Sequence, residues 1–427
     1  MTKAIIIGGG IIGLACAFYL RKEGKEVVLI DKGDPGSECS SGNMGWVCPS
    51  LSDPVPAPGL IKSSLKWMVK RDSPLYIKPS IVPSLYPWLK QFWRFCSEES
   101  YQRGYTASLE LSRKTLSLFD DLEKEGSIEF EMHRKGLLFV FLDQSYIDEK
   151  LDSYSIVESY GLPAPVAKTK KEVMEMEPAL AGTVAGGVYL PSERHVRPES
   201  LTKALKKWLI SNGAEILSHT EVIGFIQEGD NISGVKTRKK TIEGDHFLVT
   251  AGAWAGLVLR QVGIHIPMTA GKGYSITMSN PSIQFQQPLY LGDSRVTISP
   301  FHDSVRIGGT MELSGLNTNL DQRRIDSLKS SAAQYLRESI HGEEQAWCGM
   351  RPMTPDGLPI IGKTPSLNNL FIASGHAMSG ISMALSTGSV ICDLITKGMS
   401  DIDLTPFRLD RFSAKKALST QTKTVNM

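Results

Sequence analysis

The first thirty residues alternate between two kinds of hydrophobic pattern. Lys3–Ile7 and Glu26–Ile30 are short apolar runs rich in β-branched residues, which predicts two buried strands. Between them, a mainly apolar segment runs from Ile11 to about Lys22 and predicts a helix. A strand, a helix and a second strand in this order predict a parallel βαβ unit.

The rest of the pattern predicts further elements of both types. Helices are expected over 108–125, 172–177, 198–212, 323–340 and 381–397. Strands are expected over 136–142, 187–190, 215–217, 222–227, 233–237, 246–250, 274–278, 289–291, 295–298, 304–307 and 370–373. Because the strands between 267 and 309 are short and separated by turn residues, they predict an antiparallel sheet that forms a second layer. The fold class is therefore α/β.

Composition and charge narrow the classes of protein. The chain has 427 residues, of which 41% are hydrophobic and 22% are charged, as in soluble globular proteins. At about 150 residues per domain, this length favours two interleaved domains. The 47 basic and 45 acidic side chains give a net charge of +2, which argues against a nucleic-acid partner. The six cysteines form no C-x-x-C pair, so we expect reduced thiols in a cytoplasmic protein and no metal site.

Two uncharged segments must be distinguished from a signal peptide and from a membrane-spanning helix. The first, 4–20, contains several glycines and lacks a clear cleavage site, so a strand and a turn are favoured over a signal peptide. The second, 370–392, carries only His376 among titratable side chains other than cysteine, but it is rich in serine and glycine. We therefore predict no transmembrane helix.

A glycine motif joins the first strand to the first helix. In G-x-G-x-x-G, Gly8 permits a tight turn, Gly10 lets the backbone approach a pyrophosphate, and Gly13 allows the helix to pack closely on the strand. Ile11 and Ile12 lie within this motif, at the N-terminus of the helix, where unpaired N–H groups favour phosphate.

An acidic residue follows the second strand. Asp31 lies about 20 residues beyond the motif and is placed to accept hydrogen bonds from a ribose, with Lys32 beside it. The alternative is an ordinary strand, turn and helix with a solvated aspartate. The carboxylate disfavours a 2′-phosphate, so the pattern indicates FAD or NAD rather than NADP.

Three further segments are expected to face the same cofactor. A small polar loop follows the second strand, and the apolar strand at 246–250 runs into a turn of small residues. The N-terminus of the helix predicted to start near 381 can stabilise negative charge on a reduced flavin. The predicted contacts in these segments are Ser40, Ser41, Asn43, Gly45, Ala251, Gly252, Trp254, Gly380 and Ile381.

The segment 60–96 combines basic and aromatic side chains. It contains seven lysines and arginines and a single acidic residue, Asp72, interleaved with tryptophan, tyrosine and phenylalanine. This composition is typical of a peripheral membrane contact. The alternative is a helical cap with aromatic residues in its core, and Pro74, Pro79, Pro83 and Pro87 argue against one long amphipathic helix.

Taken together, these motifs resemble a known family. Over nearly its whole length the chain is similar to the D-amino-acid oxidase superfamily of FAD-dependent oxidoreductases, most closely to the D-amino acid dehydrogenases. The motifs that carry the resemblance are the glycine fingerprint with Asp31, SGNMG (41–45), VTAGAW (249–254), GKGYS (271–275), WCGMRP (347–352) and GHAMSG (375–380).

The resemblance implies FAD as the cofactor and a discontinuous, Rossmann-like FAD-binding domain over 1–58, 185–264 and 345–415. An interleaved substrate domain, built on an antiparallel sheet, would cover 59–184 and 265–344, with a flexible tail at 416–427. The resemblance also places the backbone of Val222 near the adenine.

The resemblance further implies the substrate contacts. Arg351 matches the arginine that holds a substrate carboxylate, and a guanidinium can grip a carboxylate with two hydrogen bonds. The alternative for Arg351 is a buried ion pair. Tyr274 is a second candidate for substrate binding, although an aromatic residue on a strand is often part of the core. The related oxidases carry a tyrosine where this chain has the segment 296–298, which favours the dehydrogenases.

Two histidines remain open. His376 is able to shuttle a proton or lie against the flavin, and a hydrogen-bonded structural histidine is an equal alternative. His195 occupies a loop that often carries acidic residues in relatives.

The expected activity is FAD-dependent oxidative deamination of D-amino acids to 2-oxo acids and ammonia, by hydride transfer from Cα to flavin N5. Electrons would pass to a quinone or another acceptor, and the protein would be cytoplasmic or attached to the cytoplasmic face of a membrane. Two alternatives stay open: an oxidase of glycine, sarcosine or a cyclic imino acid that uses oxygen, and a flavin-bearing subunit of a larger assembly.

Overall fold

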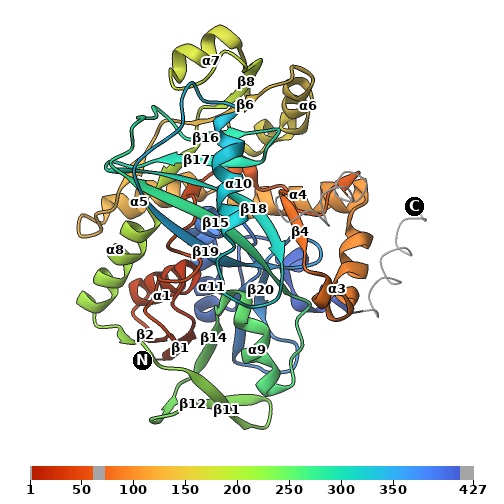
Figure 1. The fold of residues 1–427 in the computed structure, drawn as a ribbon. Coiled ribbons are helices and arrows are strands. Elements are labelled where there is room, and N and C mark those ends of the chain that lie inside the picture. The colour runs from red at the N-terminus through yellow and green to blue at the C-terminus, as the bar shows by residue number, and fades with distance from the viewer. Residues whose placement is uncertain (1, 61–72, 414–427) are drawn as a thin grey trace, which may run out of the picture.

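The computed structural model describes residues 2–60 and 73–413, and the predicted βαβ unit begins its first large sheet (Figure 1). β1 (Lys3–Ile7) and β2 (Glu26–Ile30) lie parallel, and α1 (Ile11–Lys22) connects them. The six strands are ordered β10-β2-β1-β14-β21-β20, and only β20 runs antiparallel to its neighbour. The other bounds are Glu215–Leu217 for β10, His246–Val249 for β14, Ile360–Lys363 for β20 and Leu370–Ser374 for β21.

The side chains of β1 alternate between the two faces of this sheet, and each face is covered by its own set of elements. Ala4 and Ile6 pack into a core with α1, α8 (Pro198–Ser211) and α11 (Gly380–Lys397). Ile5 and Ile7 face the other core, with α9 (Ala255–Leu259) and a three-stranded sheet of β11 (Val222–Glu228), β12 (Asn231–Thr237) and β13 (Thr241–Glu243). Side chains on a strand alternate between faces, so an unbroken apolar strand is a strand buried on both sides.

The second large sheet is mainly antiparallel, as predicted. Its order is β19-β15-β18-β17-β16-β6-β8-β7, with β4 paired to β18. The β16–β6 and β18–β4 pairs are parallel. α10 (Gln322–Ala333) packs on β18, β15 and β17 (Figure 1). The strand bounds are Leu75–Ile77 for β4, Leu137–Phe141 for β6, Val166–Thr169 for β7, Gly186–Leu190 for β8, Thr269–Ser279 for β15, Leu289–Leu291 for β16, Val296–Pro300 for β17, Ser304–Leu313 for β18 and Glu343–Met353 for β19.

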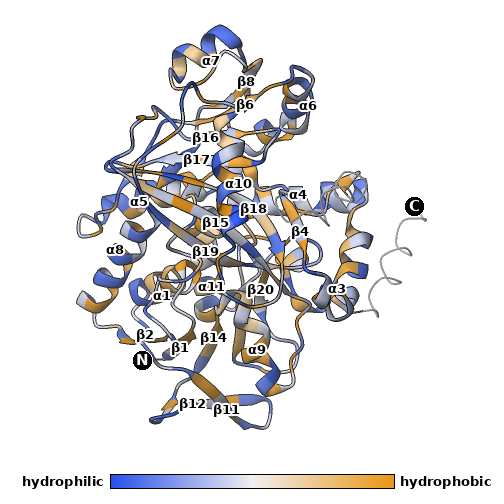
Figure 2. Cartoon of the chain, viewed as in Figure 1, coloured by the Kyte–Doolittle hydropathy of each residue, from blue (hydrophilic) through white to orange (hydrophobic). Residues whose placement is uncertain are grey.

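Shorter elements connect the two sheets. β3 (Trp46–Val47) and β5 (Met132–His133) both pair with β9 (Arg194–Val196). Several of the helices that cover the outside carry hydrophilic and hydrophobic residues together, as α8 shows in Figure 2. The remaining helices are α3 (Val82–Phe95), α4 (Glu98–Ser112), α5 (Thr115–Lys124), α6 (Ser145–Ser153) and α7 (Lys170–Met176).

Two predicted helices differ from those observed. The segment 108–125 is divided between α4 and α5, and α4 begins earlier because the Ser97 hydroxyl caps it by accepting from the Ser100 N–H. The helix expected over 323–340 ends at Ala333, and Leu336 then pairs with Leu180 in a β-bridge.

The structure also moves two predicted domain boundaries. β8 and β19, placed by the boundaries at 185 and 345 in the FAD-binding domain, pair within the second sheet. Conversely, α5 was assigned to the substrate domain, but its Phe119 and Leu122 pack in the core of the first sheet. Apolar periodicity identifies a strand or a helix without identifying the sheet on which it packs.

Parts of two predictions lie outside the described residues. These are residues 61–72 of the basic aromatic segment and the whole tail at 416–427. Within the described ranges, no helix has the length and apolar character needed to cross a bilayer.

Candidate functional site

A cavity of about 880 Å³ lies where the first sheet meets the second. Gly8, Asp31 and Thr250, which follow the carboxyl ends of β1, β2 and β14, line one part of it. Thr297 and Arg351 of the second sheet line another part. Ligands of open α/β sheets bind at the carboxyl ends of the strands, so the location fits a bound nucleotide.

The three motif glycines meet three different steric demands. Gly8 has a φ of +113°, and a Cβ there would lie 2.7 Å from the Thr250 carbonyl. A Cβ on Gly13 would lie 2.0 Å from the Gly8 oxygen, so this glycine permits the close packing of helix and strand. Gly10 lines the cavity, and the nearest atom to its hypothetical Cβ is the Ser40 Oγ at 3.3 Å. A side chain at Gly10 would therefore extend into the space at the N-terminus of α1.

Groups suited to a ribose and an adenine gather beside this turn. The Asp31 carboxylate accepts hydrogen bonds from the Gly9 N–H (2.6 Å) and the Gly33 N–H (2.7 Å), which fixes its position at the cavity wall. The Lys32 ammonium lies 3.8 Å from the centroid of the Trp254 ring. Val222, Ala251 and Gly252 also line the cavity, so the structure brings these predicted residues together.

The loop at 40–45 is held mostly by its own polar groups. The Ser40 Oγ accepts from the Ile11 N–H (2.9 Å), and the Asn43 Oδ1 accepts from the Gly45 N–H (2.8 Å). The Ser41 hydroxyl donates to the Ser37 and Glu38 carbonyls, and Ser41 is not part of the cavity wall. Direct contact of Ser41 with the cofactor is therefore not supported, whereas Ser40, Asn43 and Gly45 do line the cavity.

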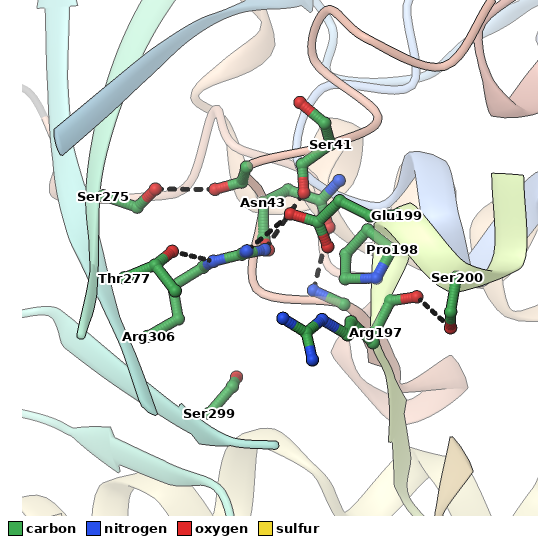
Figure 3. Close-up of polar contacts among 12 residues, drawn as sticks. Ser41, Asn43, Arg197, Pro198, Glu199, Ser200, Ser275, Thr277, Ser299 and Arg306 are labelled. Carbon is green, nitrogen blue, oxygen red and sulfur yellow. Dashed lines mark hydrogen bonds and ion pairs between the residues drawn. The ribbon is translucent and has the colours of Figure 1, made fainter. Parts of the chain in front are cut away.

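Arg306 of β18 holds this loop against the second sheet, as Figure 3 shows. Its side chain is buried, and its Nη1 donates to the Asn43 carbonyl (2.6 Å) and the Ser41 carbonyl (3.0 Å). Its Nη2 pairs with Glu199 at the start of α8 (2.6 Å), and its Nε donates to the Thr277 hydroxyl (2.9 Å). One signal for this residue was available in the sequence, because Arg306 lies between Val305 and Ile307 in a predicted strand.

We expect Arg306→Met to lower the free energy of unfolding by about 2–4 kcal/mol, because it leaves Glu199 and two loop carbonyls without their donor. Thermal unfolding of the FAD-loaded protein and the FAD dissociation constant would measure the effect. Arg323→Met, at an exposed arginine of α10, is the matched control. Equal melting temperatures for the two variants would contradict the assigned role of Arg306.

Arg351 is half-buried at the cavity wall, and its guanidinium has unused hydrogen-bond donors. Its Nη1 donates to the Thr310 carbonyl (2.7 Å), and within the described part of the chain it forms no ion pair. The guanidinium lies directly over Gly273, where a Cβ would be 2.3 Å from the Arg351 Cζ. Burial lowers the pKa of Arg351 to about 10, so it remains charged at neutral pH. A half-buried cation without an anionic partner is a strong candidate for binding a carboxylate.

Tyr274 also lines the cavity, but its hydroxyl already has a protein partner. Its neighbours Gly273 and Ser275 face the first sheet, since the Ser275 hydroxyl donates to the Gly42 carbonyl. The Tyr274 hydroxyl instead donates to Glu312 (2.7 Å), which also pairs with Lys272 (3.2 Å). The Tyr274 ring packs in the core of the second sheet, and its contact with the substrate stays a prediction.

The two histidines have different surroundings. His376 lines the cavity near Gly380 and Ile381, its Nε2 lies 3.0 Å from the Thr387 hydroxyl, and burial lowers its pKa to about 3. His195 lies outside the cavity wall, where its ring stacks on His133 with centroids 4.5 Å apart and burial lowers its pKa to about 4. Both histidines are therefore neutral at physiological pH.

The glycine turn and the carboxylate after β2 are typical of a dinucleotide-binding protein, and the Arg351 guanidinium lies at the same cavity. Residues 3–394 match the family model described as DAO, FAD dependent oxidoreductase. The chain belongs to this family, and FAD is its cofactor. The residues of the cavity fit FAD, because Gly10 leaves space at the helix N-terminus and Asp31 stands beside it.

Individual relatives agree with this assignment. The chain is 30% identical to the D-amino acid dehydrogenase of Granulibacter bethesdensis over 420 residues, which cover 96% of this chain and 100% of that protein. The crystal structure of glycine oxidase from Geobacillus kaustophilus superposes with a TM-score of 0.77 at 25% identity, covering 96% of this chain and 99% of that one. L-proline dehydrogenase from P. horikoshii has the same fold, with a TM-score of 0.76 at 21% identity and coverages of 96% and 97%.

Proposed function

We propose that the protein is a dehydrogenase that oxidises D-amino acids to 2-oxo acids and ammonia. The observation that carries the proposal is the Arg351 guanidinium, which faces the cavity and has no carboxylate partner among the described residues. The name of the Granulibacter relative supports the D-amino acid as substrate.

In this proposal the protein binds and orients the substrate. Arg351 holds the α-carboxylate with two hydrogen bonds, which fixes the position of Cα relative to the cofactor. When bound, the flavin supplies the redox chemistry by accepting the Cα hydride at N5. A substrate amine that enters neutral needs no side-chain base, and water hydrolyses the imino acid that is released.

We also propose that the electrons pass to a quinone or another acceptor at a membrane surface in the cytoplasm. α3 supports a peripheral contact, because Val82, Tyr86 and Trp93 are 41%, 57% and 52% exposed and Lys90 and Arg94 belong to the same helix. Aromatic and basic side chains together suit the interface of an anionic membrane.

Turnover assays with different acceptors test the proposal. With a D-amino acid as substrate, a soluble ubiquinone analogue should support release of 2-oxo acid and ammonia, and air should yield little hydrogen peroxide. Rapid peroxide formation without a quinone would instead favour an oxidase, the alternative suggested by the glycine oxidase structure. Tight FAD binding without turnover in the presence of any acceptor would favour the alternative that the protein is a flavin-bearing subunit of a larger assembly. Co-sedimentation with anionic vesicles tests the membrane contact separately.

A further inference from the structure

The cavity contains a cation that is distinct from Arg351 and lacks a polar partner. Lys150, in α6, lines the cavity, and its ammonium lies 4.3 Å from the centroid of the Tyr154 ring and 5.0 Å from that of Phe139. Within residues 2–60 and 73–413 this ammonium makes no hydrogen bond or ion pair. Two aromatic faces attract the ammonium of this half-buried lysine without accepting hydrogen bonds from it, so the ammonium retains three donors for a ligand.

Three other polar groups near Lys150 also lack a hydrogen-bond partner among the described residues. The Asp53 carboxylate and the hydroxyls of Tyr154 and Tyr290 belong to residues that line the cavity, and the described residues provide no hydrogen-bond partner for any of them. Tyr154 is buried, and Asp53, Lys150 and Tyr290 are half-buried at the cavity wall. Four such groups around one cavity therefore point to a polar ligand. We call the part of the cavity lined by Asp53, Lys150, Tyr154 and Tyr290 the distal recess.

The register of the second sheet places the distal recess relative to Arg351. The Arg351 guanidinium reaches the carbonyl of Thr310 in β18, and Tyr290 lies in β16, two strands away. Adjacent strands are about 4.8 Å apart, so the two places are about 10 Å apart across the sheet. Between them, Gly308 and Thr297 are paired and small, and both line the cavity. The Met44 thioether lies over Gly308, so an extended side chain that reaches the distal recess would run along Thr297 and Met44.

The distal recess is richer in donors and in positive charge than in acceptors. Lys150 and both tyrosine hydroxyls can donate, whereas Asp53 accepts only. Arg295 also lines the cavity and carries a second positive charge. Such a site favours a ligand that ends in oxygen acceptors over one that ends in an ammonium or a methyl group.

On the basis of the proposed function, we propose that the distal recess binds the substrate side chain and that Lys150 selects D-amino acids whose side chains end in a carboxylate or a carboxamide. Glutamate and glutamine are the first candidates, because their α-carboxylate and side-chain oxygens lie at opposite ends of an extended chain. Lys150 is then a specificity-determining residue.

The test compares Lys150→Met with the natural protein, since methionine keeps much of the apolar stem and removes the charge. Anaerobic flavin reduction would be measured with D-glutamate, D-glutamine and D-norleucine, which has no polar group on its side chain. We expect kcat/KM for the two polar substrates to fall by about 10-fold to 100-fold in the variant. The value for D-norleucine should change less than twofold. Lys171→Met, at an exposed lysine of α7, is the control.

A binding measurement separates recognition from turnover. The flavin absorption change on adding glutarate or hexanoate gives a dissociation constant for each, and Lys150→Met should weaken glutarate alone. Equal losses for D-glutamate and D-norleucine, or unchanged values for both, would overturn the role of the distal recess and leave the proposed function intact. Failure of every D-amino acid to reduce the flavin would overturn both.

Discussion

Replacement of Arg351 by methionine should lower kcat/KM for D-amino acids by about 100-fold to 1,000-fold while FAD stays bound. The expected size follows from the loss of a buried, charge-assisted pair of hydrogen bonds to the substrate carboxylate, about 3–4 kcal/mol. Steady-state kinetics with an artificial acceptor give the change, and the flavin absorption of the purified variant gives the FAD content.

Two further variants make the Arg351 result specific. Arg351→Lys keeps the charge but loses the planar fork, so its kcat/KM should fall between those of the natural protein and Arg351→Met. Arg323→Met, at the exposed surface of α10, should leave both quantities unchanged. If Arg351→Met bound a carboxylate inhibitor as tightly as the natural protein does, Arg351 would not be the substrate anchor.

The second large effect concerns the glycine turn. Gly10→Ala should yield a folded protein whose FAD binding is about 100-fold weaker or worse, because the methyl group extends into the cavity at the helix N-terminus and displaces charge-assisted contacts worth about 1.5–3 kcal/mol each. Gly13→Ala should lose stability as well, since its Cβ would lie 2.0 Å from the Gly8 oxygen and the backbone must shift.

FAD titrations and thermal unfolding of the apoproteins distinguish these two defects. Gly10→Ala should melt close to the natural apoprotein, and Gly13→Ala should melt well below it. Gly182→Ala is the control, because no atom lies within 4 Å of its hypothetical Cβ. Full FAD affinity in Gly10→Ala would contradict the assignment of the pyrophosphate to the start of α1.

The nucleotide half of the site could be predicted because its signals are local. β1, α1 and β2 follow one another directly, and Asp31 comes immediately after the second strand. Gly13 is constrained by the Gly8 oxygen of the same turn, whereas Gly8 is constrained by Thr250, which follows β14. Hydrophobic periodicity and residue spacing therefore sufficed for the fold of this region, and its contacts with the cofactor stay predictions.

The rest of the site depends on contacts between segments that lie far apart in the chain. Arg306 acts through the carbonyls of Ser41 and Asn43, and carbonyl acceptors have no sequence signal. The Tyr274 hydroxyl donates to Glu312 of β18, and this partner could not be predicted from the sequence around Tyr274.

The distal recess could not be predicted from the sequence either. Asp53, Lys150 and Tyr290 come from a loop, a helix and a strand that only the second sheet brings to one cavity. Their lack of polar partners, which carries the inference, is a property of the folded structure alone.

The most direct test of the account is an anaerobic titration of the purified yellow protein with matched D- and L-amino acids, followed through the flavin absorption. We predict that D-amino acids bleach the flavin and that L-enantiomers do not, with slow recovery in air and rapid recovery after addition of a quinone. Bleaching by L-amino acids alone, or by neither enantiomer, would contradict the proposal that this FAD-dependent oxidoreductase is a D-amino acid dehydrogenase.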